Sequence, residues 1–348
     1  MQKQEFLSRW LEIIKRSSAI LVYKQDFVNR LLEAIRKSAT RHTYDLAWAR
    51  ALVEAAGEVT VSPDRGETEV HLQSTAEKMI KYYWDQTVFF GLVQGANPCR
   101  QPDLMCRVRE LINDYYRGRR PGEPVCFMNA NFNPRLKEKV EEHIRAAGEI
   151  LKKDVVTRFL GKGRLNDEFI KYSGGEESLT LPQNTLAAIR ENSPLITEAL
   201  YYRWAQVLEK YNTSPRLNKK VRIIDSAELR ERPLSFYAKY LDLENPGRLC
   251  FICGQPVEDK DLSIGHVIPW SYLCSDDIWN LVYQHKSCAS AKTGPVPSEF
   301  VIARLEKKNK ALLAKLVSYV ETDMVAGALQ DAVNRNLVRK NWLCCREE

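Results

Sequence analysis

The residue types best suited to chemistry gather near the C-terminus. Two pairs of metal-ligating side chains occur there, Cys250 with Cys253 and His285 with Cys288, and each pair has two residues between its members. This spacing allows a tight turn to present both side chains of a pair to one metal ion, and two distant pairs can close a tetrahedral site. Such a site would contribute roughly 10 kcal/mol or more to the folding of a module with little core of its own. The pattern therefore predicts a structural Zn²⁺ ion.

The alternative interpretation is that Cys250 and Cys253 are simply buried or redox-active cysteines. The second ligand pair disfavours it, and Gly254 directly after the first pair suits a metal-binding turn, where a positive φ is often needed. A disulfide framework is not indicated either, because the nine cysteines are scattered and odd in number.

The segment between the two pairs predicts a short sheet. Ile264-Gly-His-Val-Ile-Pro-Trp270 predicts a strand that ends at Pro269, and residues 279–284 predict a second strand. A helix is expected to begin near Lys286. Two strands and a helix with a zinc-binding turn at their base form a ββα-metal arrangement.

At these residues the chain resembles the HNH endonucleases, and the resemblance covers roughly the last third of the sequence. The matching pieces are, in chain order, Cys250-x-x-Cys253, His266-Val-Ile-Pro-Trp-Ser-Tyr, Asp277-Ile-Trp-Asn280-Leu-Val and His285-Lys-Ser-Cys288-x-x-x-Lys292. Residues 76–84 and 204–212 more loosely resemble segments upstream of this module in bacterial restriction-type HNH proteins.

The resemblance implies roles for three further residues and for a second metal. His266 matches the general base that takes a proton from the attacking water, work for which a neutral imidazole is suited. Asn280 matches an asparagine that braces the loop and orients the histidine. Lys292 lies where a residue near the scissile phosphate is common. A divalent ion such as Mg²⁺ would stabilise the phosphate in the transition state.

Two positions depart from the family pattern. Gly265 stands where the family usually has an aspartate or histidine that binds the catalytic metal, and Ala289 stands where an asparagine or histidine supplies the other ligand. A hard divalent ion without protein oxygen ligands is held only by water and phosphate. We therefore expect metal affinity, and cleavage with it, to be low.

Three explanations for these departures compete. The chain is an inactivated variant made to trap uncut DNA, or a natural pseudo-nuclease, or a protein in which a nearby donor such as Asp261 or Ser290 substitutes. We favour the first, because His266, Asn280 and the zinc ligands around the two gaps are all present.

The elements that must position this site divide the chain into two predicted domains. Residues 1–215 are mainly helical by periodicity, with a long helix that begins after Asn133 and runs to about Leu160. Residues 58–62 and 67–72 predict a small hairpin. A basic connecting segment then leads into residues 216–348, the expected nuclease module. The predicted fold class is α+β, a largely helical N-terminal domain with a C-terminal zinc-stabilised ββα-metal module.

The charge balance favours a polyanionic partner. The formal net charge is +7, which suits double-stranded DNA without proving it. We take Lys152, Lys153, Lys219, Lys220 and Arg222 as candidate DNA contacts. The alternative for the first two is a solvated helix face, because nearby glutamates dilute the positive charge.

These observations lead to three functional hypotheses. The first is a restriction or phage-defence DNA endonuclease, the second a non-cleaving DNA-binding protein on an HNH fold, and the third a zinc-stabilised scaffold for another protein. One HNH site cuts one strand, so double-strand cleavage would indicate a homodimer. Neither a membrane span nor a signal peptide is expected, which predicts a cytoplasmic protein.

Overall fold

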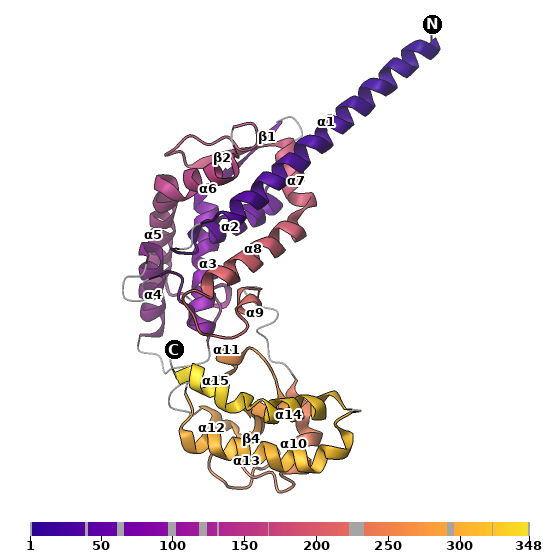
Figure 1. Ribbon diagram of the computed structural model, residues 1–348. Helices are drawn as coiled ribbons and strands as arrows, with labels where there is room; N and C mark the ends of the chain where they lie inside the picture. Colours follow the sequence, from indigo (N-terminus) through magenta and orange to yellow (C-terminus); the bar gives the residue numbers. More distant parts are fainter. Residues whose placement is uncertain are drawn as a thin grey trace. The chain divides into compact units, whose positions relative to one another are not determined.

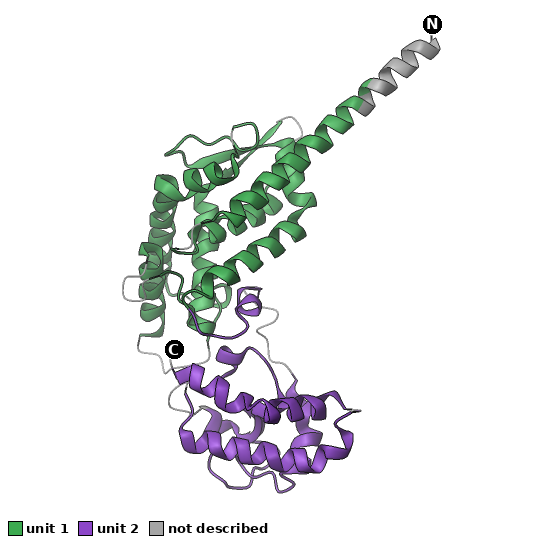
Figure 2. Ribbon diagram, viewed as in Figure 1, with its two compact units in different colours: residues 1–211 green, residues 212–348 purple. Residues whose placement is uncertain are grey.

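The computed structural model describes residues 2–38, 41–60, 66–96, 102–117, 124–130, 132–165, 167–222, 233–290, 296–321 and 323–346. The chain forms two compact units, unit 1 over residues 1–211 and unit 2 over residues 212–348 (Figure 2). The boundary lies four residues before the one expected from the sequence. None of the described helices is both long and apolar enough to cross a lipid bilayer.

Unit 1 is mostly helical and carries one two-stranded sheet (Figure 1). Its helices are α1 (Gln2–Arg36), α2 (Tyr44–Glu58), α3 (Leu72–Phe90), α4 (Asp103–Tyr116), α5 (Pro134–Ile150), α6 (Val156–Gly163), α7 (Gln183–Glu191) and α8 (Ser193–Leu208). A 3₁₀ turn, η1, covers Phe127–Asn129, and a π-helical turn, η2 (Leu151–Val155), joins α5 to α6. The strands are β1 (Glu67–His71) and β2 (Ser178–Pro182).

Large aromatic side chains fill the core of unit 1. Trp48 of α2, Trp84 of α3 and Trp204 of α8 have no exposed surface. Each packs edge-on against another aromatic ring, as Trp48 does against Phe159 with centroids 5.5 Å apart. Rings of this size bury enough apolar area to dominate the packing energy, so α2, α3, α6 and α8 converge on one core.

The hairpin predicted for residues 58–62 and 67–72 is wrong where the structure describes it, and residues 61–65 lie outside the described residues. Helix α2 continues through Glu58, and β1 instead pairs antiparallel with β2, with Glu67 opposite Pro182 and His71 opposite Ser178. The turn residues correctly predicted a strand at β1 but not its partner. The partner strand β2 lies more than 100 residues later, and such a distant pairing leaves no local pattern in the sequence.

The long helix predicted from Asn133 is confirmed, although its middle is not regular. Asn133 caps α5 by accepting a hydrogen bond from the backbone N–H of Leu136 at 2.9 Å, and Pro134 opens the first turn. The helical path continues through η2 and α6 to Gly163. The sequence pattern did not indicate the π-helical turn in η2.

Cations of α6 are tied to a buried carboxylate of α2. Asp45 has no exposed surface, and it accepts hydrogen bonds from the Arg158 guanidinium (2.7 Å to Nη2) and from the Lys162 ammonium. Because a buried carboxylate is costly unless it is paired, these two cations are needed inside unit 1.

Unit 2 wraps helices around a second small sheet. Its helices are α9 (Leu217–Arg222), α10 (Ala238–Glu244), α11 (Trp270–Leu273), α12 (Lys286–Ser290), α13 (Glu299–Leu316), α14 (Met324–Asn334) and α15 (Leu337–Arg346). Three 3₁₀ turns are η3 (Leu234–Tyr237), η4 (Ile278–Asn280) and η5 (Val317–Tyr319). The strands are β3 (Leu262–His266) and β4 (Leu281–His285), antiparallel with Gly265 opposite Val282.

Helices α10, α13, α14 and α15 supply the hydrophobic core that an isolated two-stranded sheet lacks. Ile302, Leu305 and Leu312 of α13 are fully buried in one cluster with Trp279 of η4 and Trp342 of α15. A two-stranded hairpin is only marginally stable by itself in water. The packed helices therefore stabilise the sheet and fix its position within unit 2.

Asp45→Asn is expected to lower the free energy of unfolding of unit 1 by about 2–3 kcal/mol, because it leaves two cations beside a buried group that no longer balances them. Urea unfolding of the full chain, followed by far-UV circular dichroism, measures the change.

The matched control is Asp154→Asn, since Asp154 pairs with the same Arg158 but its side chain is 61% exposed. An exposed pair contributes about 1 kcal/mol or less. Equal effects of the two variants would contradict the proposed importance of the buried pair.

Candidate metal centre and the adjoining cavity

The first ligand pair lies on a tight turn. The backbone N–H of Gly254 donates to the carbonyl of Cys250 at 2.8 Å, and the N–H of Cys250 donates to the carbonyl of Gln255 at 2.8 Å. Gly254 has a φ of 77°, which confirms the positive φ expected there. The turn is fixed to the sheet by a hydrogen bond from the N–H of Phe251 to the carbonyl of Tyr283.

The four predicted zinc ligands come together in space. The ligand atoms of Cys250, Cys253, His285 and Cys288 all lie within 4.8 Å of one another. The His285 Nδ1 atom is 3.4 Å from Cys253 Sγ and 3.7 Å from Cys288 Sγ. A tetrahedral zinc ion places nitrogen and sulfur ligands roughly 3.5 Å apart. The cluster could therefore bind a structural zinc ion.

The outer nitrogen of His285 supports this assignment. Its Nε2 lies 3.2 Å from the carbonyl oxygen of Pro256, which can only accept a hydrogen bond. The proton therefore belongs on Nε2, and Nδ1 is left with the lone pair that a metal needs. Such an outer hydrogen bond is characteristic of metal-ligating histidines.

The cysteines of the cluster differ in their affinity for protons. Burial by itself would raise the pKa of Cys250, but hydrogen bonds from backbone N–H groups, including that of Cys253, lower the pKa to about 6. Burial and the neighbouring thiols raise the pKa of Cys288 to about 11. Cys288 must therefore lose a proton when a metal ion binds.

Strands β3 and β4 and helix α12 carry the remaining site residues, in the predicted strand–strand–helix order. Strand β3 ends at His266, three residues before Pro269, and β4 begins at Leu281 after the 3₁₀ turn η4. Strand β3 therefore ends earlier than predicted, because the N–H of Ile268 donates to the Asn280 side chain and not to the backbone of a neighbouring strand.

Asn280 fixes the loop that follows His266. Its side chain is fully buried, with Oδ1 accepting from the N–H of Ile268 and Nδ2 donating to the carbonyl of the same residue, both at 2.8 Å. The N–H of Val267 donates to the carbonyl of Asn280 at 3.0 Å. These three bonds set the direction in which the chain leaves His266.

Helix α13 braces the other side of Asn280. The Lys308 ammonium donates to the carbonyls of Leu281 (2.9 Å) and Ile278 (3.3 Å), and Asn309 donates to the carbonyl of Trp279 (2.7 Å). Burial lowers the pKa of Lys308 to about 8. The sequence did not predict this buried role of Lys308, because the helix carries several other lysines and arginines.

His266 pairs with a carboxylate that the sequence analysis missed. Its Nε2 lies 3.0 Å from Oδ1 of Asp276, and the two side chains are only 16% and 18% exposed. Asp276 lies in the loop after α11, ten residues beyond His266, where no motif spacing marks it. With Nε2–H donating to Asp276, the basic lone pair of the imidazole lies on Nδ1.

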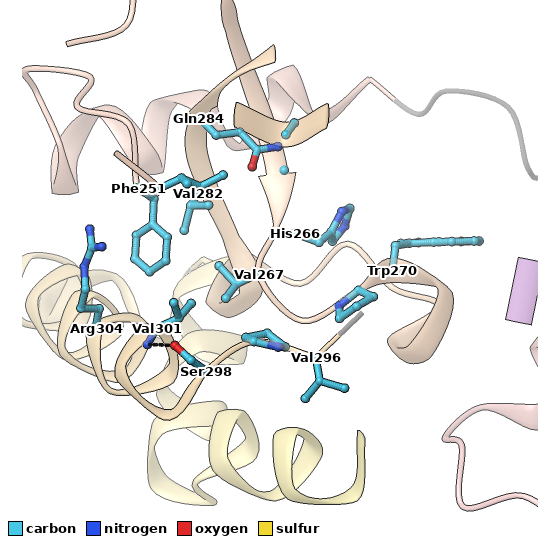
Figure 3. A pocket seen from close by; sticks show the side chains of 15 residues that line it. Phe251, His266, Val267, Trp270, Val282, Gln284, Val296, Ser298, Val301 and Arg304 are labelled. Carbon is cyan, nitrogen blue, oxygen red and sulfur yellow. Dashed lines mark hydrogen bonds between the residues drawn. The ribbon is translucent and has the colours of Figure 1, made fainter. Parts of the chain in front are cut away.

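A cavity of about 620 Å³ adjoins His266 (Figure 3). Gly265, His266 and Ala289 all line it, so the structure brings the predicted base together with both positions that lack a metal donor. The remaining lining residues are mostly apolar. They are Phe251, Ile252, Val267, Pro269, Trp270, Val282, Gln284, Val296, Pro297, Ser298, Val301 and Arg304.

Of the two substitute donors suggested by the sequence, Asp261 is not among the described residues that line this cavity. Asp261 instead accepts a hydrogen bond from the backbone N–H of Lys286 at 3.1 Å, at the start of α12. The side chain of Ser290 and the whole of Lys292 lie outside the described residues. None of the described lining residues carries a carboxylate. Positions 265 and 289 therefore do not fit the catalytic metal that the resemblance implies.

The three candidate DNA contacts of the basic segment differ in exposure: Lys220 is buried, Lys219 is half-buried and Arg222 is exposed. Lys220 is fully buried, hydrogen-bonded to Ser214, with its ammonium 5.4 Å from the centre of the Tyr272 ring. The prediction that Lys220 contacts DNA is wrong for this conformation, because a buried ammonium cannot reach a phosphate. Lys219 donates to the carbonyl of Cys274 at 3.1 Å, and Arg222 to Asn218 at 3.3 Å.

The candidate contacts on the long helix differ from each other. Lys152 is paired with Glu149 at 2.7 Å and with Glu177, and its side chain is 11% exposed. Lys153 is exposed. The charge of Lys152 is thus balanced within unit 1, while Lys153 is available to a partner.

No family model matches the chain, and no similar protein was found among curated proteins or solved structures. The functional interpretation therefore rests on the residues themselves.

Cys288→Ser is expected to abolish stoichiometric zinc binding by the full chain, as measured by elemental analysis after dialysis. Removal of zinc by a chelator should unfold unit 2, because the free energy of zinc binding contributes to folding. Zinc affinity should fall on acidification, since protons then compete for the Cys288 sulfur.

The control is Cys344→Ser, an exposed cysteine outside the cluster, which should retain zinc. Full zinc content in Cys288→Ser, or none in the unchanged chain, would exclude the Cys₃His site.

Proposed function

We propose that unit 2 is an HNH-type ββα-metal nuclease module and that the protein acts on double-stranded DNA. One observation carries the proposal. Strands β3 and β4 and helix α12 place His266, Gly265 and Ala289 on the wall of one cavity beside a Cys₃His cluster. The sequence resemblance assigns those same positions to the base and to the two catalytic-metal ligands.

In this proposal His266 is the general base for phosphodiester hydrolysis. The Asp276 carboxylate accepts a hydrogen bond from Nε2–H and so orients the ring, which leaves Nδ1 to take the proton from the attacking water. Asn280 acts indirectly, by fixing the backbone at Ile268 and so the position of the histidine.

The chain as it stands should cleave poorly. A divalent ion at this site would stabilise charge on the phosphate and on the leaving oxygen, yet neither Gly265 nor Ala289 offers a ligand. We propose that these two positions, and not the histidine or its supports, limit activity. The biological role that suits such a module is restriction or phage defence, with DNA recognition in unit 1 or in a partner.

The second candidate is a DNA-binding protein that does not cleave. The observation that favours it is the lack of any carboxylate among the described residues that line the cavity. Such a protein would bind DNA tightly, with the steep salt dependence that phosphate contacts produce, and would remain inactive when the ligands are restored.

The test is the double variant Gly265→Asp, Ala289→Asn, incubated with plasmid DNA and Mg²⁺. The flexible end of the Gln284 side chain must move aside to admit the aspartate. We expect nicked or linear products from the double variant and none from the unchanged chain, measured by gel electrophoresis. Linear product at early times would indicate two copies acting together, since one HNH site cuts one strand.

The matched control adds His266→Ala to the double variant, which should lower the rate by about 100-fold or more if the histidine is the base. Cleavage that survives this change would reject His266 as the base. Tight DNA binding without products from the double variant would favour the non-cleaving alternative.

A further inference from the structure

The wall of the cavity beside His266 contains a buried amide that the proposed mechanism does not use. Gln284 of β4 is 5% exposed, and its Oε1 atom has no hydrogen-bond partner among the described residues. Figure 3 shows this amide turned toward the cavity. A buried acceptor costs free energy unless a donor reaches it. The amide therefore indicates a ligand that carries an N–H or O–H group.

The glycine at residue 265 leaves room for this amide. A Cβ atom built on Gly265 would overlap Nε2 of Gln284 and would lie 2.5 Å from Cδ, so a larger residue would displace the amide. With glycine at this position, the amide keeps its donor, Nε2, next to its acceptor, Oε1, at the wall of the cavity.

The rest of the cavity suits a flat ligand with apolar faces. Its volume of about 620 Å³ lies within the range of about 300–1,000 Å³ that is typical of small-molecule sites. Most of the wall is apolar and includes Phe251, Val282 and Val301. None of the described lining residues carries a carboxylate, so these residues offer no counter-charge to a cationic ligand.

Arg304 of α13 adds a positive charge to this wall. Its guanidinium lies over the Phe251 ring, 4.6 Å from the ring centre, and forms no ion pair with another described residue. A guanidinium stacked on a ring can still donate from its N–H groups, and arginine is well suited to bind phosphate. The ligand that matches the whole wall is flat, carries a hydrogen-bond donor and bears a negative charge.

Adenine nucleotides have all of these features. The exocyclic amino group of adenine donates and the neighbouring N7 accepts, and a glutamine amide can bind this edge with both of its polar atoms. We propose that the cavity binds an adenine nucleotide, with the base hydrogen-bonded to Gln284 and the phosphate paired with Arg304. This ligand goes beyond the proposed function, since phosphodiester hydrolysis at His266 does not require it.

The first test uses the zinc-loaded full chain and titration calorimetry. It compares dAMP with purine deoxynucleoside monophosphate, which differs only in lacking the 6-amino group. We expect the unchanged chain to prefer dAMP about tenfold or more, because the analogue leaves the buried Oε1 unpaired. Gln284→Leu should bind the two nucleotides equally. The control, Gln330→Leu, alters an α14 glutamine that is hydrogen-bonded to Asn334 and should keep the preference.

The second test compares dAMP with deoxyadenosine, which has no phosphate. The unchanged chain should bind dAMP about tenfold or more tightly, and Arg304→Gln should bind the two alike, because the pairing of guanidinium with phosphate is lost. The control is Arg335→Gln, since Arg335 pairs with Asp331 at 2.7 Å. This variant should keep the difference.

A single-stranded oligothymidylate with one central adenine identifies the source of the nucleotide. If the strand binds more tightly than its all-thymine counterpart, and Gln284→Leu removes that advantage, the cavity accepts an adenine within DNA. If dAMP alone depends on Gln284, the ligand is a free nucleotide. Both results support the site.

Misfolding is separated from ligand loss by zinc content and stability. Gln284→Leu should retain its zinc and unfold at the same or a higher urea concentration than the unchanged chain, because it removes a buried unpaired acceptor. A preference for the amino group that survives in Gln284→Leu would overturn the inference, as would a lack of dAMP binding at millimolar concentration. A phosphate advantage that survives in Arg304→Gln would overturn the role of Arg304.

The outcome is independent of the nuclease test. If dAMP does not bind while the double variant at residues 265 and 289 cuts DNA, the proposed nuclease function stands. If dAMP binds through Gln284 but that double variant never cuts, the nucleotide site stands and the nuclease function fails.

Discussion

The short β3–β4 sheet of unit 2 is held between the Cys₃His cluster and helix α13. Strands β3 and β4 form a sheet of two short strands, which has too few hydrogen bonds to hold its own shape in water. The four ligand residues lie on the turn before β3, at the end of β4 and on α12, so a zinc ion bound to them would close the sheet at one end. Helix α13 closes the other end through Lys308 and Asn309. The position of His266 is set between these two attachments.

Short spacings in the sequence were enough to predict the metal cluster, the strand–strand–helix order and the cap at Asn133. Each of these depends on residues within a few positions of one another, where local geometry leaves a pattern. Asp276, Lys308 and Gln284 were missed because their roles come from register and packing.

The positions of lysines and arginines in the sequence did not indicate which residues are exposed to a polyanionic partner. Lys220 and Lys308 are buried among backbone carbonyls, hydroxyls and rings, and Arg158 and Lys162 neutralise Asp45. Side chains of this length can bury their stems and place a charge where an internal acceptor needs it. A net charge of +7 therefore says little about which surface a polyanion would touch.

The crowding between residues 265 and 284 has an evolutionary consequence. Because the amide of Gln284 fills the space beside Gly265, an acid at the first position and a long side chain at the second compete for one volume. Relatives of this chain that carry an acid at 265 should therefore tend to have a smaller or outward-turned residue at 284. If residues 265 and 284 change together among relatives, the glutamine has adapted to the presence of a glycine at residue 265.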